Sequence, residues 1–144
     1  MDVAVKRLDT GLKLPSFAKY GDAGLDLFAK VSLELLPNND RKLVPTGIAV
    51  AIPFGYAGLI LPRSGMALKH GITCLNSPGL IDSGYRGEIQ CILVNTDPTH
   101  SFFIERGDRI GQLVIIKVPE VNLIEVDDLD QTERGEHGFG HSGR

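Results

Sequence analysis

Short runs of β-branched and apolar residues recur along the first 126 residues, and turn-forming loops such as 36–40 and 95–100 separate them. Only residues 64–70, with the sequence SGMALKH, are suited to a helical turn or two. Runs of this length and spacing predict an all-β domain, either a sandwich, a barrel or a jelly roll. The expected strands lie within 3–8, 31–35, 42–52, 57–62, 71–75, 88–95, 101–105, 109–118 and 121–126.

The pattern stops after Val126, where the sequence turns to charged residues and glycine. Such a segment buries too little apolar surface to order itself, so we expect a β domain over 1–126 and a flexible arm over 127–144. The arm is acidic. Residues 1–119 carry 13 basic and 11 acidic side chains, a balance of +2, whereas 120–144 carry 2 and 7, a balance of −5. This charge is typical of a solvated segment.

The remaining composition excludes several classes of protein. The sequence has no basic tract of the kind that binds long nucleic acid. It also has no apolar window with the length of a membrane span, and Met1-Asp2-Val3 begins no signal peptide. Cys74 and Cys91 each lie inside an apolar run, which favours buried reduced thiols over a bridge. Together these features favour a cytoplasmic protein.

Five stretches place polar residues where a β fold does not require them: DAGLDLFA (22–29), PRSGMA (62–67), GLIDSGYRGE (79–88), RIGQL (109–113) and RGEHGFGHSG (134–143). In the second, a guanidinium, a hydroxyl and free backbone N–H groups suit a phosphate. Each stretch alone has an ordinary structural interpretation, as a turn residue or an edge-strand polar residue. The spacing of His137 and His141 suggests a metal pair, but the glycines between them disfavour a helix and no Cys/His cluster completes a zinc site.

In this order and spacing, the five stretches closely resemble the five motifs of the trimeric dUTP diphosphatases (dUTPases), in a bacterial style, from about Val3 to Gly143. The resemblance implies a homotrimeric jelly roll with three active sites at subunit interfaces and a C-terminal arm that closes over them. It also implies that dUTP and water give dUMP and pyrophosphate with Mg²⁺. Such an enzyme limits uracil incorporation into DNA and supplies dUMP for thymidylate synthesis.

The resemblance assigns the deoxyuridine to a β-hairpin formed by the third motif. Backbone groups of Gly79, Leu80 and Ile81, with the Asn76 side chain, would match the O4 acceptor and N3–H donor of uracil, which cytosine reverses. The narrow hairpin would also exclude a thymine methyl group. Tyr85 would pack beneath the sugar and exclude a ribose. Asp82 would accept from the 3′-OH and orient the attacking water as the general base.

The other motifs are assigned to the triphosphate. Asp26 would hold a water bound to Mg²⁺, and the arm would place Phe139 on the uracil. The remaining residues expected to bind substrate are Arg63, Ser64, Gly65, Gln90, Gln112, Arg134, Gly140, His141 and Ser142, with Arg134 and Ser142 on the γ-phosphate. Two residues depart from the family pattern. His141 stands where a small hydroxyl residue is usual, and Gly111 replaces an alanine, which is expected to loosen its strand.

Two alternatives remain. A dCTP deaminase shares this fold and much of the phosphate site, but its catalytic glutamate would fall at Ile92, and without a carboxylate the proton transfer fails. A non-catalytic nucleotide-binding or regulatory protein on the same fold would be expected to lack Asp82 or the arm, and both are present.

Overall fold

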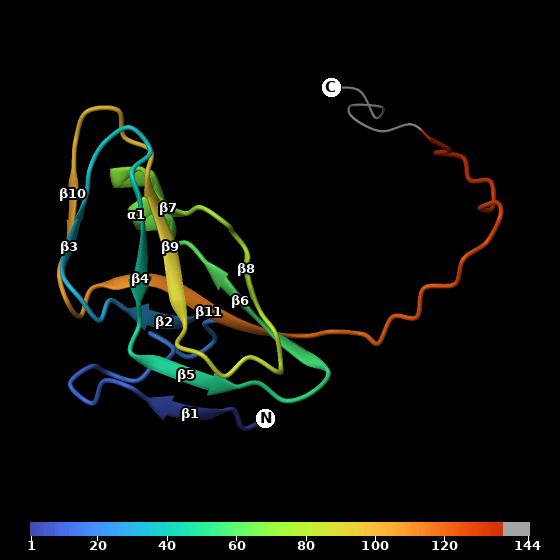
Figure 1. The fold of residues 1–144 in the computed structure, drawn as a ribbon, viewed down its shortest axis with the longest axis horizontal. Coiled ribbons are helices and arrows are strands. Elements are labelled where there is room, and N and C mark those ends of the chain that lie inside the picture. The colour runs from blue at the N-terminus through green and yellow to red at the C-terminus, as the bar shows by residue number, and fades with distance from the viewer. Residues whose placement is uncertain (137–144) are drawn as a thin grey trace.

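Eleven strands and one short helix make up the computed structural model of the chain, which describes residues 1–136 (Figure 1). The elements are β1 (Ala4–Arg7), β2 (Leu25–Phe28), β3 (Leu33–Leu35), β4 (Arg41–Pro45), β5 (Ile48–Ala51), β6 (Tyr56–Leu61), α1 (Ser64–His70), β7 (Ile72–Cys74), β8 (Gly79–Ile81), β9 (Gln90–Asn95), β10 (Phe102–Ile104) and β11 (Arg109–Lys117). The predicted all-β class and the predicted helical turn at 64–70 are confirmed.

The strands pair antiparallel in four small sheets. The largest has the order β2-β11-β6-β8, and a second has the order β4-β9-β7. Two strand pairs, β1-β5 and β10-β3, complete the arrangement. Most neighbours within a sheet are distant in sequence, which is typical of jelly-roll connections. The longest strand, β11, pairs with β2 on one side and with β6 on the other, so it organises the largest sheet.

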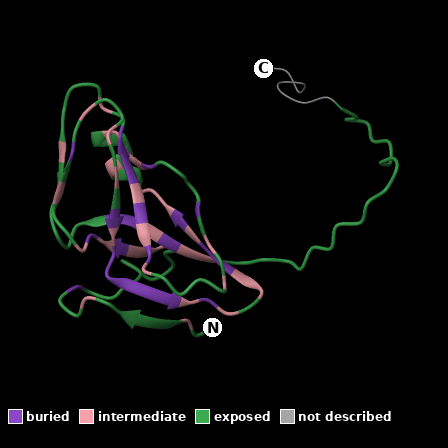
Figure 2. Cartoon of the chain, in the orientation of Figure 1, coloured by how far each residue is buried: buried purple, intermediate pink, exposed green. Residues whose placement is uncertain are grey.

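The core lies between the sheets, where alternate side chains of each strand point inward. Figure 2 shows the buried positions along β5, β6 and β9. Most of the largest fully buried side chains are aliphatic: Leu27, Leu35, Ile52, Ile72, Ile89, Leu93, Ile104 and Ile110. Among residues 1–136, no buried side-chain polar atom lacks a hydrogen-bond partner. The inward face is therefore apolar, and its few polar groups are satisfied.

The expected single strand at 42–52 is two strands, which is a correction to the sequence prediction. Gly47 has a φ of 74°, a conformation that favours glycine, and it separates β4 from β5. The backbone N–H of Gly47 donates to Oε1 of Glu88 at 2.8 Å. The turn lets the chain leave one sheet and enter another, because β4 pairs with β9 and β5 pairs with β1.

Residues 118–136 leave the β domain as an extended, exposed segment without helix or strand (Figure 1, orange to red). The strand predicted at 121–126 is therefore wrong for the single chain. Its large apolar side chains are uncovered: Val121, Leu123, Ile124 and Val126 are all exposed. A run of this kind forms a strand only where a sheet edge is available to pair with it.

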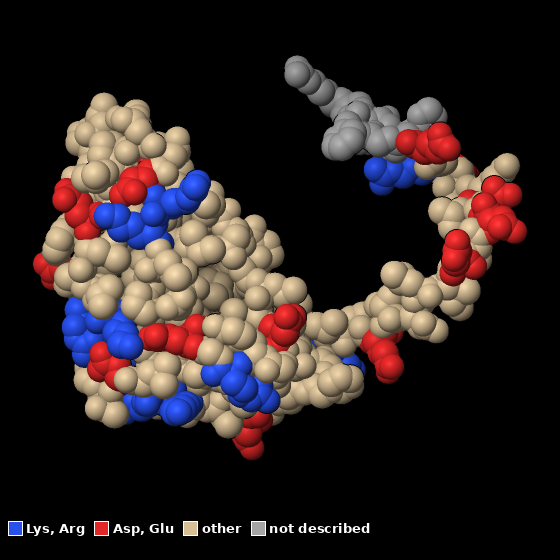
Figure 3. Space-filling view, in the orientation of Figure 1, with Lys and Arg blue, Asp and Glu red and all other residues tan. Residues whose placement is uncertain are grey.

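The surface carries charges of both signs. On the face in Figure 3, basic and acidic side chains lie near one another on the β domain, whereas the extended segment is mostly acidic. Within residues 1–136, the structure contains no helix that is long and apolar enough to cross a membrane.

Candidate functional site

Asp26 lies between two guanidinium groups where β2, β11 and the start of α1 come together. Its Oδ1 atom is 3.6 Å from Nε of Arg63, and its Oδ2 atom is 3.3 Å from Nη1 of Arg109. Nη1 of Arg63 also donates to the backbone carbonyl of Arg109 at 3.2 Å. The carboxylate and Arg63 are half-buried. Their mutual contacts hold both cations in place, with N–H groups left for an anion.

Gln112 joins this group from β11, directly opposite Asp26 on β2. Its Nε2 atom donates to the carbonyl of Pro62 at 3.1 Å. A side chain at Gly24 would collide with this amide, because a Cβ there would lie 3.1 Å from Cβ and from Cδ of Gln112. Glycine at position 24 thus leaves room for Gln112. We call Asp26, Arg63, Arg109 and Gln112 the phosphate cluster.

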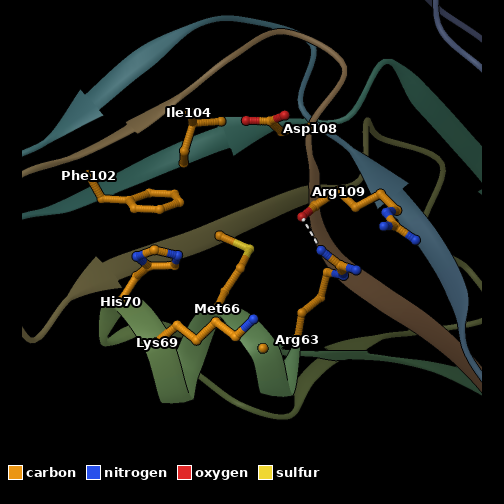
Figure 4. A pocket seen from close by; sticks show the side chains of 9 residues that line it. Arg63, Met66, Lys69, His70, Phe102, Ile104, Asp108 and Arg109 are labelled. Carbon is orange, nitrogen blue, oxygen red and sulfur yellow. Dashed lines mark hydrogen bonds between the residues drawn. The ribbon is translucent and has the colours of Figure 1, made fainter.

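A cavity of about 380 Å³ opens beside the phosphate cluster, between α1 and the strands β10 and β11. Figure 4 shows Arg63 and Arg109 at one end and His70 facing Phe102 at the other, with ring centroids 4.8 Å apart. Gly65 and Lys69 also line the cavity. Ser64 begins α1 and is exposed. The second and fourth motifs therefore meet on one side of the domain.

The third motif lies on β8 and the turn that follows it. β8 is the last strand of its sheet and pairs only with β6 among the strands of residues 1–136, so its outer backbone N–H and C=O groups are not part of a ladder. Leu80 is 62% exposed. The Asn76 amide lies beside β8, since a Cβ on Gly79 would be 3.4 Å from its Nδ2 atom. Of the hairpin expected in the third motif, the structure contains one strand, β8, followed by turns, and the next strand, β9, pairs with β4 and β7.

The turn presents a carboxylate and an aromatic ring to solvent. Asp82 is exposed, and within residues 1–136 its carboxylate forms no hydrogen bond or ion pair. Its backbone carbonyl accepts from the N–H of Tyr85 at 3.1 Å. The Tyr85 hydroxyl donates to the carbonyl of Glu88 at 3.0 Å. An ordinary turn aspartate would bond to nearby amides, and the Asp82 carboxylate forms no such bond among the described residues.

Asp82 and the phosphate cluster do not meet within one chain. β2 and β8 form opposite edges of the four-stranded sheet. Asp26 and Leu61 both lie opposite Gln112, whereas Ile81 pairs with Gly58, three residues before Leu61 in β6. Three strand spacings and this offset separate Asp26 from Asp82 by roughly 15–20 Å. One substrate phosphate cannot contact both side chains of the same chain.

The remaining predicted residues are placed as follows. Gln90 begins β9 opposite Pro45 and is half-buried. Arg134 lies in the exposed extended segment. Phe139, Gly140, His141 and Ser142 lie outside the described residues. Gly111 is buried in β11, beside a register irregularity between Arg109 and itself, and a Cβ there would lie 3.3 Å from Sγ of Cys91.

Arg109 is the member of the phosphate cluster that sequence reasoning missed. It stands three residues before Gln112, and a basic residue at the start of that strand was the available signal. Within residues 1–136, no group of three or more His, Cys, Asp or Glu side chains is arranged to hold a metal ion.

The all-β fold, the phosphate cluster and the exposed carboxylate turn together define a nucleotide-binding jelly-roll protein. The sequence profile of the dUTPase family matches residues 11–143, so the chain belongs to that family. The resemblance inferred from the five motifs is confirmed.

Similar proteins agree with this assignment. A deoxyuridine 5'-triphosphate nucleotidohydrolase of Mycobacterium bovis is 51% identical over 146 residues, covering 98% of this chain and 94% of the relative. One of Corynebacterium efficiens is 48% identical, covering 99% and 78%. The solved Staphylococcus bacteriophage 80alpha dUTPase with dUpNHpp has a TM-score of 0.89 and 31% identity, with 99% of each chain covered. A phage phi11 dUTPase, described with a structural Mg(II) ion, has a TM-score of 0.80 and 26% identity, covering 89% of this chain and 98% of that one.

Proposed function

We propose that this chain hydrolyses dUTP to dUMP and pyrophosphate. The observation that carries the proposal is the combination of the phosphate cluster with Asp82, which is exposed, has no partner for its carboxylate within residues 1–136 and lies next to an open strand edge. Membership of the dUTPase family supports it, as do relatives named for this reaction. The product dUMP would supply thymidylate synthesis, and removal of dUTP would limit uracil in DNA.

The open edge of β8 would read the base. An edge strand offers alternating N–H donors and C=O acceptors, which suit the N3–H and O4 of uracil. Cytosine reverses both groups and would leave buried polar groups unpaired, a mismatch worth about 10⁴–10⁵ in selectivity. The Asn76 amide beside Gly79 is placed to add a further contact. Backbone groups of Leu80 and Ile81 would carry the main recognition.

Asp82 would act as the general base. Its carboxylate is free of protein partners among the described residues and stands next to Tyr85, which would lie against the deoxyribose. We assign it the orientation of a water for in-line attack on the α-phosphorus, with pyrophosphate leaving on the opposite side. Phosphoryl chemistry of this kind depends mainly on positioning and on neutralising charge.

The phosphate cluster would neutralise the triphosphate. Arg63 and Gln112 would contact phosphate oxygens, and Ser64 and Gly65 at the start of α1 would add polar groups. The donor set fits Mg²⁺, which binds phosphate oxygens, keeps several waters and requires few protein ligands. Asp26 would hold one of those waters. When bound, Mg²⁺ offsets phosphate charge, and the chain's own residues orient the substrate and the attacking water.

The separation of Asp26 and Asp82 supports an active site shared between copies. We propose a homotrimer in which the phosphate cluster of one copy meets the Asp82 turn of a second. The exposed apolar run at 121–126 supports this assembly, because it needs a partner to cover it. We propose the boundary at residue 126, with an arm over 127–144 that supplies Arg134, Phe139, Gly140, His141 and Ser142. Gln90 remains a candidate contact.

The state of the two cysteines supports a cytoplasmic location. Cys74 and Cys91 are free and buried. The hydrogen bond with Cys74 and burial raise the pKa of the Cys91 thiol, so it stays protonated and unreactive. A protein with two reduced thiols in its core suits the cytoplasm.

Pyrophosphate release from dUTP, dCTP and dTTP, each measured with Mg²⁺ and with EDTA, tests the function. We expect turnover of dUTP alone, lost with EDTA. Ammonia release from dCTP would instead support a deaminase, which the apolar Ile92 on β9 disfavours. Binding of dUTP without turnover would support a non-catalytic nucleotide-binding protein and contradict the proposal.

A further inference from the structure

The Tyr85 ring lies directly over Gly87, two residues further along the same turn. A Cβ atom on Gly87 would lie 2.5 Å from Cζ of the tyrosine, closer than real Cβ atoms come without a shift, and 3.0 Å from Cε2, which is tighter than most real contacts. The Tyr85 hydroxyl continues past Gly87 and donates to the carbonyl of Glu88 at 3.0 Å. The absence of a side chain at position 87 therefore allows the ring to occupy this place.

The backbone at Gly87 does not itself require glycine. Its φ lies outside the positive region that L side chains rarely adopt, unlike the φ of 65° at Gly71. The obstacle to an alanine is the end of the Tyr85 side chain rather than backbone. Tyr85 is 43% exposed, so the ring has open space into which it can turn. An added methyl group would displace the phenol and leave the turn intact.

We propose that Gly87 is a positioning residue for sugar selection: it forms the surface on which the Tyr85 ring rests, so that the ring blocks a ribose 2′-hydroxyl. The inference rests on the proposed function, since it assigns to Gly87 the placement of a residue that reads the sugar. Gly87 acts through Tyr85 and contacts no substrate. A purely structural glycine would change stability or overall rate, whereas this one changes the preference between two sugars.

Gly84 provides a matched control in the same turn. Its φ is also outside the positive region, and among the described residues no atom beyond its chain neighbours lies within 4 Å of a Cβ placed there. Alanine at position 84 therefore adds the same methyl group to the turn, and among the described residues it could meet only its chain neighbours Ser83 and Tyr85. Any effect common to Gly84→Ala and Gly87→Ala reflects the turn, and any difference reflects the ring.

The experiment compares Gly87→Ala, Gly84→Ala, Tyr85→Ala and the double variant Tyr85→Ala/Gly87→Ala in the full chain. The measurement is kcat/KM for UTP relative to dUTP, with dCTP relative to dUTP as a second ratio. We expect Gly87→Ala to raise the UTP ratio by about 10-fold or more, as for a pocket that excludes one small group. The double variant should match Tyr85→Ala, because the methyl has nothing left to displace. The ratio of kcat/KM for dCTP to that for dUTP should stay at the wild-type value in Gly87→Ala. Both ratios should stay at their wild-type values in Gly84→Ala.

A wild-type UTP ratio in Gly87→Ala would overturn the proposal, as would a double variant that exceeds Tyr85→Ala. A Tyr85→Ala variant with an unchanged UTP ratio would instead refute sugar reading by Tyr85, and with it the proposed role of Gly87. The ring position has its own readout. The chain has three tyrosines, and in protein labelled with 3-fluorotyrosine, Tyr85→Phe assigns one ¹⁹F resonance. Gly87→Ala should shift that resonance more than Gly84→Ala does, because the methyl group at position 87 would overlap the ring itself. A shift in Gly87→Ala no larger than in Gly84→Ala contradicts the contact even if dUTP hydrolysis is absent.

Discussion

The Nη1 atom of Arg109 lies 3.3 Å from the Oδ2 atom of Asp26, and this contact ties the start of β11 to the middle of β2. Because Asp26 also contacts Arg63, the removal of one cation alters the setting of the other. The Arg109 carbonyl would still accept from Arg63 in an alanine variant, so Arg109→Ala keeps the backbone contact and removes only the guanidinium beside Asp26.

We expect Arg109→Ala to lower kcat/KM for dUTP by about 10- to 100-fold, since hydrogen bonds to charged groups contribute about 1.5–3 kcal/mol. Arg109→Lys should recover part of the loss, because it keeps the charge without the planar fork. The control is Arg41→Ala, at an exposed position on β4. Steady-state kinetics that are equal in the Arg109 and Arg41 variants would remove Arg109 from the site.

Asp82→Asn should bind dUTP and hydrolyse it about 10²–10⁴-fold more slowly. The amide keeps the shape of the side chain and can bond to the sugar, but it is a far poorer proton acceptor. Binding is measured by calorimetry and turnover by pyrophosphate release. Ser83→Ala is the neighbouring control. Near-normal turnover in Asp82→Asn would exclude this carboxylate as the base.

Removal of residues 131–144 should leave a folded assembly with very low activity. The described part of this segment is exposed and contributes nothing to the core. The deletion removes Arg134, Phe139 and Ser142, and the loss of one such electrostatic donor alone costs about 10²–10³ in kcat. Phe139→Ala should give a milder defect. Light scattering and pyrophosphate release check both effects. Full activity would refute the proposed arm, and dissociation would make the tail structural.

Asp97 should contribute stability that is lost in acid. The backbone N–H groups of Thr99 and His100 each donate to its Oδ1 atom at 2.8 Å, and these bonds lower the pKa of Asp97 from 3.8 to about 2. A lowered folded-state pKa stabilises the protein above the unfolded-state value, and this contribution disappears as the pH falls from about 4 to about 2. Asp97→Asn should therefore be less stable than wild type near neutral pH, and the difference should shrink in that window. Urea unfolding at several pH values measures it, and a pH-independent difference would contradict it.

Most strands were predictable because β-branched residues and turn signals alternate regularly, and the helix at 64–70 contains no β-branched residue. The run at 42–52 was expected as one strand because apolar and β-branched residues stand on both sides of Gly47, but the positive φ at Gly47 separates two strands. The strand expected at 121–126 has the right pattern but pairs with no sheet edge in the described residues of the single chain. The local sequence predicts that a segment can form a strand, but it does not predict which strand pairs with it.

The site was predictable in its motifs but less so in its geometry. Asp26, Arg63 and Gln112 do meet, whereas the gap between them and Asp82 depends on strand order, which no local pattern encodes. Arg109 was missed because a basic residue at a strand start is common on surfaces. Gly111 was expected to loosen β11. An irregularity does lie beside it, and Sγ of Cys91 lies near the space of the missing methyl.

The placement of β2 and β8 at opposite edges of one sheet has a consequence for mixtures of variant chains. If a complete site takes its phosphate cluster and its carboxylate from different copies, two inactive variants should complement each other. Arg63→Ala chains and Asp82→Asn chains, refolded together in equal amounts, should regain about a quarter of the wild-type sites, since each interface then draws its halves at random. Each variant refolded alone should stay inactive. A mixture as inactive as its parents would place both halves within one chain.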